Sequence, residues 1–447
     1  MPGILPLIPL HGIASRHDLP LPFGFVLIGA AAVLAISFAV LLLAWRQPRF
    51  TSDPGRPVPR IQALVDNRVV RTVARLLVLA LFGWIGLAVA FGPDQLTNPV
   101  FGFVFVWLWV GLVPLSLIMG PVWRVVNPLR TLHDGLCRLA RTDPDQGLVE
   151  LSARLGVWPA ALSLFAFAWL ELVQPDRTTL NVIRVWVLAW LVIMIIGAVL
   201  GGRRWIGATD PFEAYATTVA RLSPWRRSGD GGLRLVNPLA GLNAADLPVG
   251  TAGVVAVLLG STAFDSFANL SWWIQTVQSS DASPVLWETA GLLTMIGIVM
   301  ITFAAASAWL ARFPDRAGRR LSPSEAVRAM SGSLVPIVVG YAIAHYATLL
   351  IVEGQRVVVN LSDPLGLGWN VFSTADLVVS TAIFSHPTGV ALLQLGAIVG
   401  GHLLGIVAAH EKAVSLLDPR FALAGQWPLL VVMVGYTCAG LVLLFSP

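Results

Sequence analysis

Residues 24–45, GFVLIGAAAVLAISFAVLLLAW, decide the fold class of this chain. The stretch holds no charged side chain, and about 20 consecutive apolar residues are what a helix needs to cross the hydrocarbon core of a bilayer. Residues 101–120 form another uncharged stretch of this kind. The two segments predict transmembrane helices and exclude an ordinary soluble domain.

The composition of the whole chain supports the same interpretation. Of its 447 residues, 56% are hydrophobic and 12% are charged, whereas soluble proteins carry about 25% charged residues. The charges gather between long apolar runs. The excess of basic residues would indicate nucleic acid binding in a soluble protein, but here it is explained by the placement of cytoplasmic loops during insertion. We therefore expect a lipid bilayer and no nucleic acid as the chain's surroundings.

Ten apolar runs are long enough to be spans, and they predict an all-α polytopic protein whose 447 residues form one membrane domain. The expected spans lie near residues 24–45, 76–92, 101–120, 157–174, 181–201, 250–272, 285–311, 334–353, 388–410 and 428–446.

The basic residues predict the orientation of these spans. If the chain starts outside, the inward loops hold nearly all of the 29 lysine and arginine residues. The exceptions are Arg16, Arg177, Arg184 and Arg356. Cytoplasmic loops of membrane proteins carry such an excess. We expect both termini on the extracytoplasmic side of a bacterial inner (plasma) membrane.

The inward loops contain a recurring helix-start signal, in which a residue with a good capping side chain precedes a proline. The pairs are Asn127-Pro128, Asp210-Pro211, Asn237-Pro238, Ser322-Pro323 and Asp418-Pro419. They predict short amphipathic helices along the cytoplasmic surface. Such helices anchor the protein at the interface or offer a docking surface to a partner in a membrane complex.

Two of these starts belong to a weak internal repeat. The segment from Asn127-Pro128-Leu129 to Arg138-Leu139 aligns with the segment from Asp210-Pro211-Phe212 to Arg221-Leu222, and each comes after a span that ends in glycine. Because both segments come after outside-to-inside spans, a repeat here would be parallel.

Ionisable groups within the spans are the first candidates for a functional site, because they are costly to place in lipid. Asp265 lies in the sixth expected span, and Ser261, Thr262 and Asn269 share its helical face. The stripe indicates either a site centred on the carboxylate or hydrogen bonding between helices.

Two histidines add to this region. Tyr341 and His345 share a face of the eighth span, and His402 lies at similar depth in the ninth, beside the small residues Gly401 and Gly405. We expect a cluster of Asp265, His345 and His402 that relays protons or binds a substrate, with Tyr341 and Asn269 beside it. Alternatively, His345 and His402 ligate a transition metal or haem iron.

Further ionisable groups are expected at the outer ends of the spans. They are Glu171, Glu288, Glu353 and His386. Arg184 is close enough in the predicted topology to pair with Glu171. His410 and Glu411, at the other end of the ninth span, are expected to be solvated.

Several motifs resemble a group of bacterial polytopic membrane proteins labelled fenitrothion hydrolase-like. They are His11-Gly12-Ile13 with Arg16, Asp18-Leu19-Pro20, the repeated Arg-x-Val-Asn-Pro-Leu at 124–129 and 234–239 (with Leu235 at x), and a C-terminal run of Gln426, Pro428-Leu429, Val432-Met433-Val434, Tyr436-Thr437 and Gly440-Leu441. The resemblance covers the whole length and implies hydrolysis of an organophosphate triester.

The sequence supports three hypotheses for function. The intramembrane Asp/His cluster favours a permease or an ion- or metal-handling protein. The resemblance favours a membrane-bound organophosphate hydrolase, although the sequence shows no nucleophile elbow or paired-metal motif. The histidine pair and the cytoplasmic helices fit a haem- or copper-binding protein or an assembly factor for a membrane complex.

Overall fold

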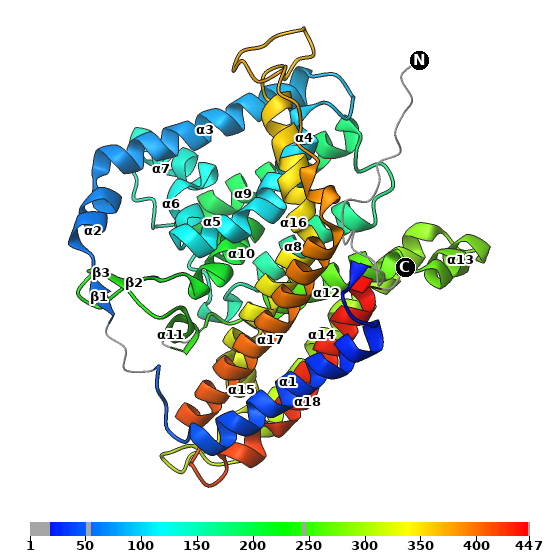
Figure 1. Cartoon of the computed structure of the whole chain (residues 1–447). Helices are drawn as coiled ribbons and strands as arrows, with labels where there is room; N and C mark the ends of the chain where they lie inside the picture. The colour runs from blue at the N-terminus through cyan, green and yellow to red at the C-terminus, as the bar shows by residue number, and fades with distance from the viewer. Residues whose placement is uncertain (1–17, 51–54, 244–246, 446–447) are drawn as a thin grey trace.

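A computed structural model describes residues 18–50, 55–243 and 247–445 of the chain (Figure 1). Within these residues, ten helical segments are long and apolar enough to cross a membrane, as the sequence predicted. The chain is an all-α polytopic membrane protein. The ten segments are Phe23–Ala44, Arg68–Phe91, Pro99–Met119, Ala153–Leu172, Leu180–Thr209, Thr251–Ala268, Pro284–Leu310, Pro323–Asn360, Pro387–Leu416 and Ala422–Phe445.

Helices α12 (Thr251–Ala268) and α16 (Val335–Asn360) form the centre of the molecule and are its most buried spans. Helix α17 (Pro387–Leu416) packs against α16 at glycines (Figure 1). A Cβ atom at Gly401 would lie 2.6 Å from the Pro336 carbonyl oxygen. Only glycine allows this close approach of one helix to its neighbour.

The spans at the periphery of the helix bundle expose most of their apolar side chains. In α3 (Arg68–Phe91), the buried residues are Ile85 and Ala88 alone. Helix α1 (Phe23–Ala44) lies beside α17 and α18 (Ala422–Phe445), so the first and last spans are neighbours (Figure 1). Apolar side chains exposed all along such helices are what a lipid environment requires.

Four of the five predicted helix starts are confirmed, because α7 (Pro128–Ala140), α10 (Pro211–Val219), α11 (Pro238–Asn243) and α15 (Pro323–Met330) begin at the proline. The fifth is wrong, since Asp418 caps a turn and the next helix begins at Ala422.

Helix α10 does not lie along a surface as predicted. Eight of its residues are buried, among them Phe212 and Tyr215, and it packs against α5 (Leu112–Met119) and α8 (Trp158–Leu172). In α7, by contrast, Leu132, Leu136 and Leu139 are exposed. Docking of a partner on α7 stays a prediction.

The remaining elements are two further spans, parts of spans and short segments. They are the helices α2 (Pro59–Asp66), α4 (Pro99–Gly102), α6 (Val122–Val126), α9 (Leu180–Thr209), α13 (Ser271–Ser279) and α14 (Pro284–Leu310), the π-helix η2 (Phe103–Gly111), the 3-10 turns η3 (Ala153–Leu155), η4 (Ala220–Leu222), η5 (Ser331–Leu334) and η6 (Ala382–Ser385), and the strands β1 (Arg56–Pro57), β2 (Trp225–Arg227) and β3 (Leu233–Leu235). The strands form a small antiparallel sheet of order β1-β3-β2, which joins residues 56–57 to residues 225–235.

Residues 367–384, between α16 and α17, are irregular apart from the start of η6. The ionisable N-terminal motif that begins at His11 lies outside the described residues, except for its part from Asp18 onward.

Candidate functional site

Asp265 is the centre of a buried polar cluster between α12 and α16. His345 Nε2 lies 2.9 Å from Asp265 Oδ2, and the Tyr346 hydroxyl donates to the same oxygen at 3.0 Å. The three side chains are all buried. The predicted meeting of Asp265 and His345 is therefore present in the structure.

The other ring nitrogen of His345 continues the chain of contacts. Its Nδ1 lies 3.3 Å from Ser266 Oγ, which is 3.0 Å from the Tyr341 hydroxyl. Tyr341 was predicted to lie beside the site, whereas Ser266 and Tyr346 were missed. Both sit one residue away from a predicted member, and their role depends on how α12 and α16 face each other.

The row of hydrogen bonds from Tyr341 to Asp265 can donate in either direction. With Asp265 ionised, Tyr341 donates to Ser266, Ser266 donates to Nδ1 of His345, and Nε2–H of His345 donates to the carboxylate. When the carboxyl group is protonated, every donor in the chain can turn around and each contact is kept. The arrangement can therefore take up a proton at one end and deliver one at the other.

The rest of the predicted polar stripe on α12 bonds to its own helix. The hydroxyl groups of Ser261 and Thr262 donate to the Leu258 carbonyl oxygen at 3.3 and 2.8 Å. Asn269 Nδ2 donates to the backbone oxygen of Asp265 at 2.6 Å. These three side chains thus bond within α12 and not to a neighbouring helix as the alternative expected, and of the stripe only the carboxylate belongs to the cluster.

His402 is buried but is not bonded to His345 or Asp265. Its Nδ1 lies 2.9 Å from the Ile398 carbonyl oxygen of its own helix, and its Nε2 has no hydrogen-bond partner. In the described part of the chain, no three His, Cys, Asp or Glu side chains gather as they would around a metal ion. The structure therefore does not join the histidine pair expected to ligate a metal or haem.

The four groups expected at the outer ends have different environments. Glu288 accepts from Trp273 Nε1 at 3.4 Å, Glu353 pairs with Arg356 at 2.8 Å, and His386 is exposed at the start of α17. Glu171 is 6% exposed.

The predicted ion pair between Glu171 and Arg184 is wrong. Arg184 donates to the backbone oxygens of Val89 and Ala90 at 2.6 and 3.3 Å. These carbonyl groups lie near the end of α3, where the last turn has no partners of its own. Arg184 thus caps a neighbouring helix instead of pairing with an acid.

A small cavity adjoins the cluster. It has a volume of about 10 Å³, which is about the room that one water needs. Tyr346, Tyr215, Thr262 and Trp109 are the residues of its lining that carry polar side-chain atoms. The lining thus offers the several polar partners that a buried water requires.

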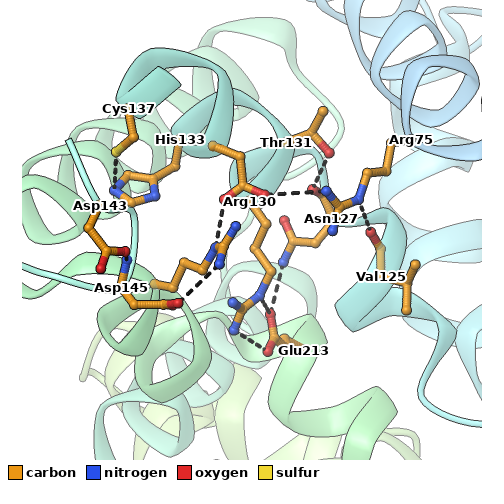
Figure 2. A network of polar contacts seen from close by, with 12 residues as sticks. Arg75, Val125, Asn127, Arg130, Thr131, His133, Cys137, Asp143, Asp145 and Glu213 are labelled. Carbon is orange, nitrogen blue, oxygen red and sulfur yellow. Dashed lines mark hydrogen bonds and ion pairs between the residues drawn. The ribbon is translucent and has the colours of Figure 1, made fainter. Parts of the chain in front are cut away.

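A second polar region lies where α7 and α10 begin (Figure 2). Asn127 Nδ2 donates to Asp210 Oδ2 at 2.7 Å. Arg130 holds Glu213 with two hydrogen bonds of 2.6 Å each. We call Asn127, Arg130, Asp210 and Glu213 the repeat junction, because residues at aligned positions of the internal repeat contact each other.

The backbone preceding the junction repeats as well. Gly120 has φ 75° and ψ −154°, and Gly202 has φ 61° and ψ −160°. Each glycine breaks a span and is followed by a short helical piece and then by the capped proline. This positive-φ conformation is open to glycine and strained for other residues. The weak repeat in the sequence therefore has a structural counterpart.

Charges at the junction are compensated within it and around it. Asp134 accepts from Arg203 at 2.7 Å and from Arg75 at 3.3 Å. Burial raises the pKa of Asp210 to about 7, and the charge of Glu213 adds to this effect, while donors from Trp123, the Phe212 amide and Asn127 lower the pKa by less.

His410 and Glu411 are buried and not solvated as expected. Glu411 accepts from Trp45 Nε1 at 2.8 Å and from the amides of Arg49 and Phe50 at 2.7 Å each. The loop after α1 folds back over this end of α17, which the sequence did not indicate.

Comparison with known proteins adds no relative to this picture, because no family model, curated protein or solved structure matches the chain. The assignment of a function therefore depends on the geometry of the Asp265 cluster and of the repeat junction.

Proposed function

We propose that the protein is a permease or ion-handling protein of the inner membrane that binds a proton at Asp265 and His345. The hydrogen-bonded chain from Tyr341 through Ser266 and His345 to Asp265 is the observation that carries this proposal. A structural role would be served by hydroxyl groups alone, as on the rest of α12. A carboxylate and an imidazole in direct contact also offer a proton acceptor and donor.

The surroundings of the pair favour a change of charge during function. Helix α12 contains no lysine or arginine, and Arg356, the one such residue of α16, pairs with Glu353. The hydroxyl donors that reach the pair are neutral. An ionisable group held in this way marks an ion or proton pathway in many membrane proteins. The placement of both termini outside belongs to the same proposal and is supported by the basic inward loops.

Proton flux into liposomes tests the proposal. The full-length protein is reconstituted with a pH-sensitive dye inside, and a potassium gradient with valinomycin sets an inside-negative potential. We expect faster acidification than in empty liposomes, and loss of this excess in Asp265→Asn, which has nearly the same shape and no charge to titrate. Equal rates for the wild-type protein and Asp265→Asn would contradict the proposal.

The resemblance to fenitrothion hydrolase-like proteins supplies the competing proposal. The same purified protein, incubated with a nitrophenyl phosphate triester and divalent metal ions, would release nitrophenol if the chain is a hydrolase. Release that survives Asp265→Asn would place the activity elsewhere in the molecule.

A further inference from the structure

Glu171 is a buried carboxylate that has no role in the chain of contacts described above. It lies at the end of α8, and its Oε2 atom has no hydrogen-bond partner. An ionised carboxylate in so apolar a place is costly unless it is paired. A buried carboxyl oxygen without a hydrogen-bond partner therefore calls for a neutral form of the group or for a bound cation.

The packing of α8 on α12 brings Glu171 to the level of Asp265. At one end of the pair, a Cβ atom at Gly253 would lie 3.3 Å from the Cβ of Ala161. At the other end, Phe264 and Val173 belong to one hydrophobic cluster. The two helices thus run side by side in the same direction, so the residues preceding Val173 face those around Phe264.

Electrostatic interactions between the side chains agree with this register. The charge of Asp265 acts on Glu171, and the cation of Arg177 acts on it in the opposite sense and less strongly. Both carboxylates act on the hydroxyl group of Tyr346. Tyr215, from the buried helix α10, also feels the charge of Glu171. Tyr215 and Tyr346 both line the small cavity, so the two tyrosines that feel the charge of Glu171 lie beside a space for one water.

We propose that Glu171 is a second proton-binding residue, coupled to Asp265 as one carboxylate pair. Two buried carboxylates that feel each other's charge resist being ionised together. Asp265 receives hydrogen bonds from Tyr346 and His345, which stabilise its ionised form. Glu171 holds the proton in the resting state, and Asp265 carries the negative charge. Only the use of this proton in transport rests on the proposed function; its binding does not.

Infrared pH titration of the purified, full-length protein tests this inference, because a protonated buried carboxyl group has its own C=O stretch. We expect a wild-type band from Glu171 that is lost in Glu171→Gln. In Glu171→Gln, the band of Asp265 should titrate with a midpoint displaced from its wild-type value by about one pH unit or more, as for coupled groups. Glu353→Gln is the matched control, because Glu353 pairs with Arg356 near an outer end; its spectrum should equal that of the wild type.

Each outcome decides between the inference and its alternatives. An unchanged carboxyl band in Glu171→Gln would overturn the inference, and so would a lost band with no displacement of the other midpoint. If Glu171→Gln fails to fold, Glu171→Asp retains the carboxyl group and should shift the band without abolishing it. If the titration succeeds while flux is unaffected by Asp265→Asn, the carboxylate pair stands and the proposed transport function fails.

Discussion

The Asp265 cluster and the repeat junction both bury carboxylates, but they treat the charge in opposite ways. At the junction, Glu213 is held by two hydrogen bonds from the buried guanidinium of Arg130. In the cluster, Asp265 is held by an imidazole and a phenol, which carry no permanent charge. A fixed counter-charge stabilises one protonation state, whereas neutral donors allow the state to change. The comparison assigns a structural role to the Arg130–Glu213 ion pair of the junction and functional proton binding to the cluster.

The largest effect is expected from breaking the ion pair of the junction. Arg130→Ala leaves Glu213 buried without its cation, and removing one partner of such a pair costs about 4 kcal/mol. The free energy of unfolding in detergent measures this loss. The double variant Arg130→Met/Glu213→Leu should recover most of it, since apolar replacement of both partners is tolerated. A loss below about 1 kcal/mol in Arg130→Ala would make the junction unimportant for stability.

The next effect concerns pH. Burial raises the pKa of Asp210 from 3.8 to about 7, so the folded protein retains a proton that the unfolded chain loses. This stabilisation is complete below the unfolded pKa and is lost as the pH rises through the folded value. From about pH 5 to about pH 7, the free energy of unfolding should fall by about 2 kcal/mol. Asp210→Asn should flatten this dependence on pH. An unchanged slope of unfolding free energy against pH in the variant would show that Asp210 is not its source.

A smaller effect is expected in the cluster itself. Tyr346→Phe removes one hydrogen bond to the Asp265 carboxylate, which costs about 2 kcal/mol. The flux should fall as well, because the proton of the phenol is lost from the pathway. Unaltered stability together with unaltered flux would show that Tyr346 takes no part in the site. Unfolding and flux are measured on the same preparation.

The smallest effect is expected at the exposed pair of Arg356 and Glu353. Their side chains are 52% and 19% exposed, and exposed ion pairs contribute about 0.5 kcal/mol. Arg356→Ala should therefore leave unfolding and flux nearly unchanged. A loss comparable to that of Arg130→Ala would remove the distinction between buried and exposed pairs on which the comparison is based.

The sequence predicted the spans well because the signal is local. Hydrophobic length and the absence of charge locate Phe23–Ala44 and Pro99–Met119 without any knowledge of their neighbours. It failed where burial depends on distant segments. Helix α10 begins at the predicted proline but is enclosed by α5 and α8.

The sequence predicted part of the site because a charged residue within a span is also a local signal. Asp265 and His345 stand out because charge is rare within spans, and the structure brings them together. Ser266 and Tyr346 are ordinary span residues by type, so only the rotation of α12 against α16 reveals them. His402 has the right type and depth but turns to the Ile398 carbonyl oxygen. Periodicity places a residue on a helical face but does not say which helix that face meets.

Proton flux compared between two variants tests the central claim most directly. Liposomes containing Asp265→Asn and liposomes containing Arg130→Met/Glu213→Leu are measured at equal amounts of folded protein. We predict that liposomes with Asp265→Asn acidify no faster than empty liposomes. Liposomes with the junction variant should keep at least about half of the wild-type rate of acidification, because its two replaced residues have only a structural role. Wild-type flux in Asp265→Asn, with loss of flux in the junction variant, would contradict the assignment of proton binding to the cluster.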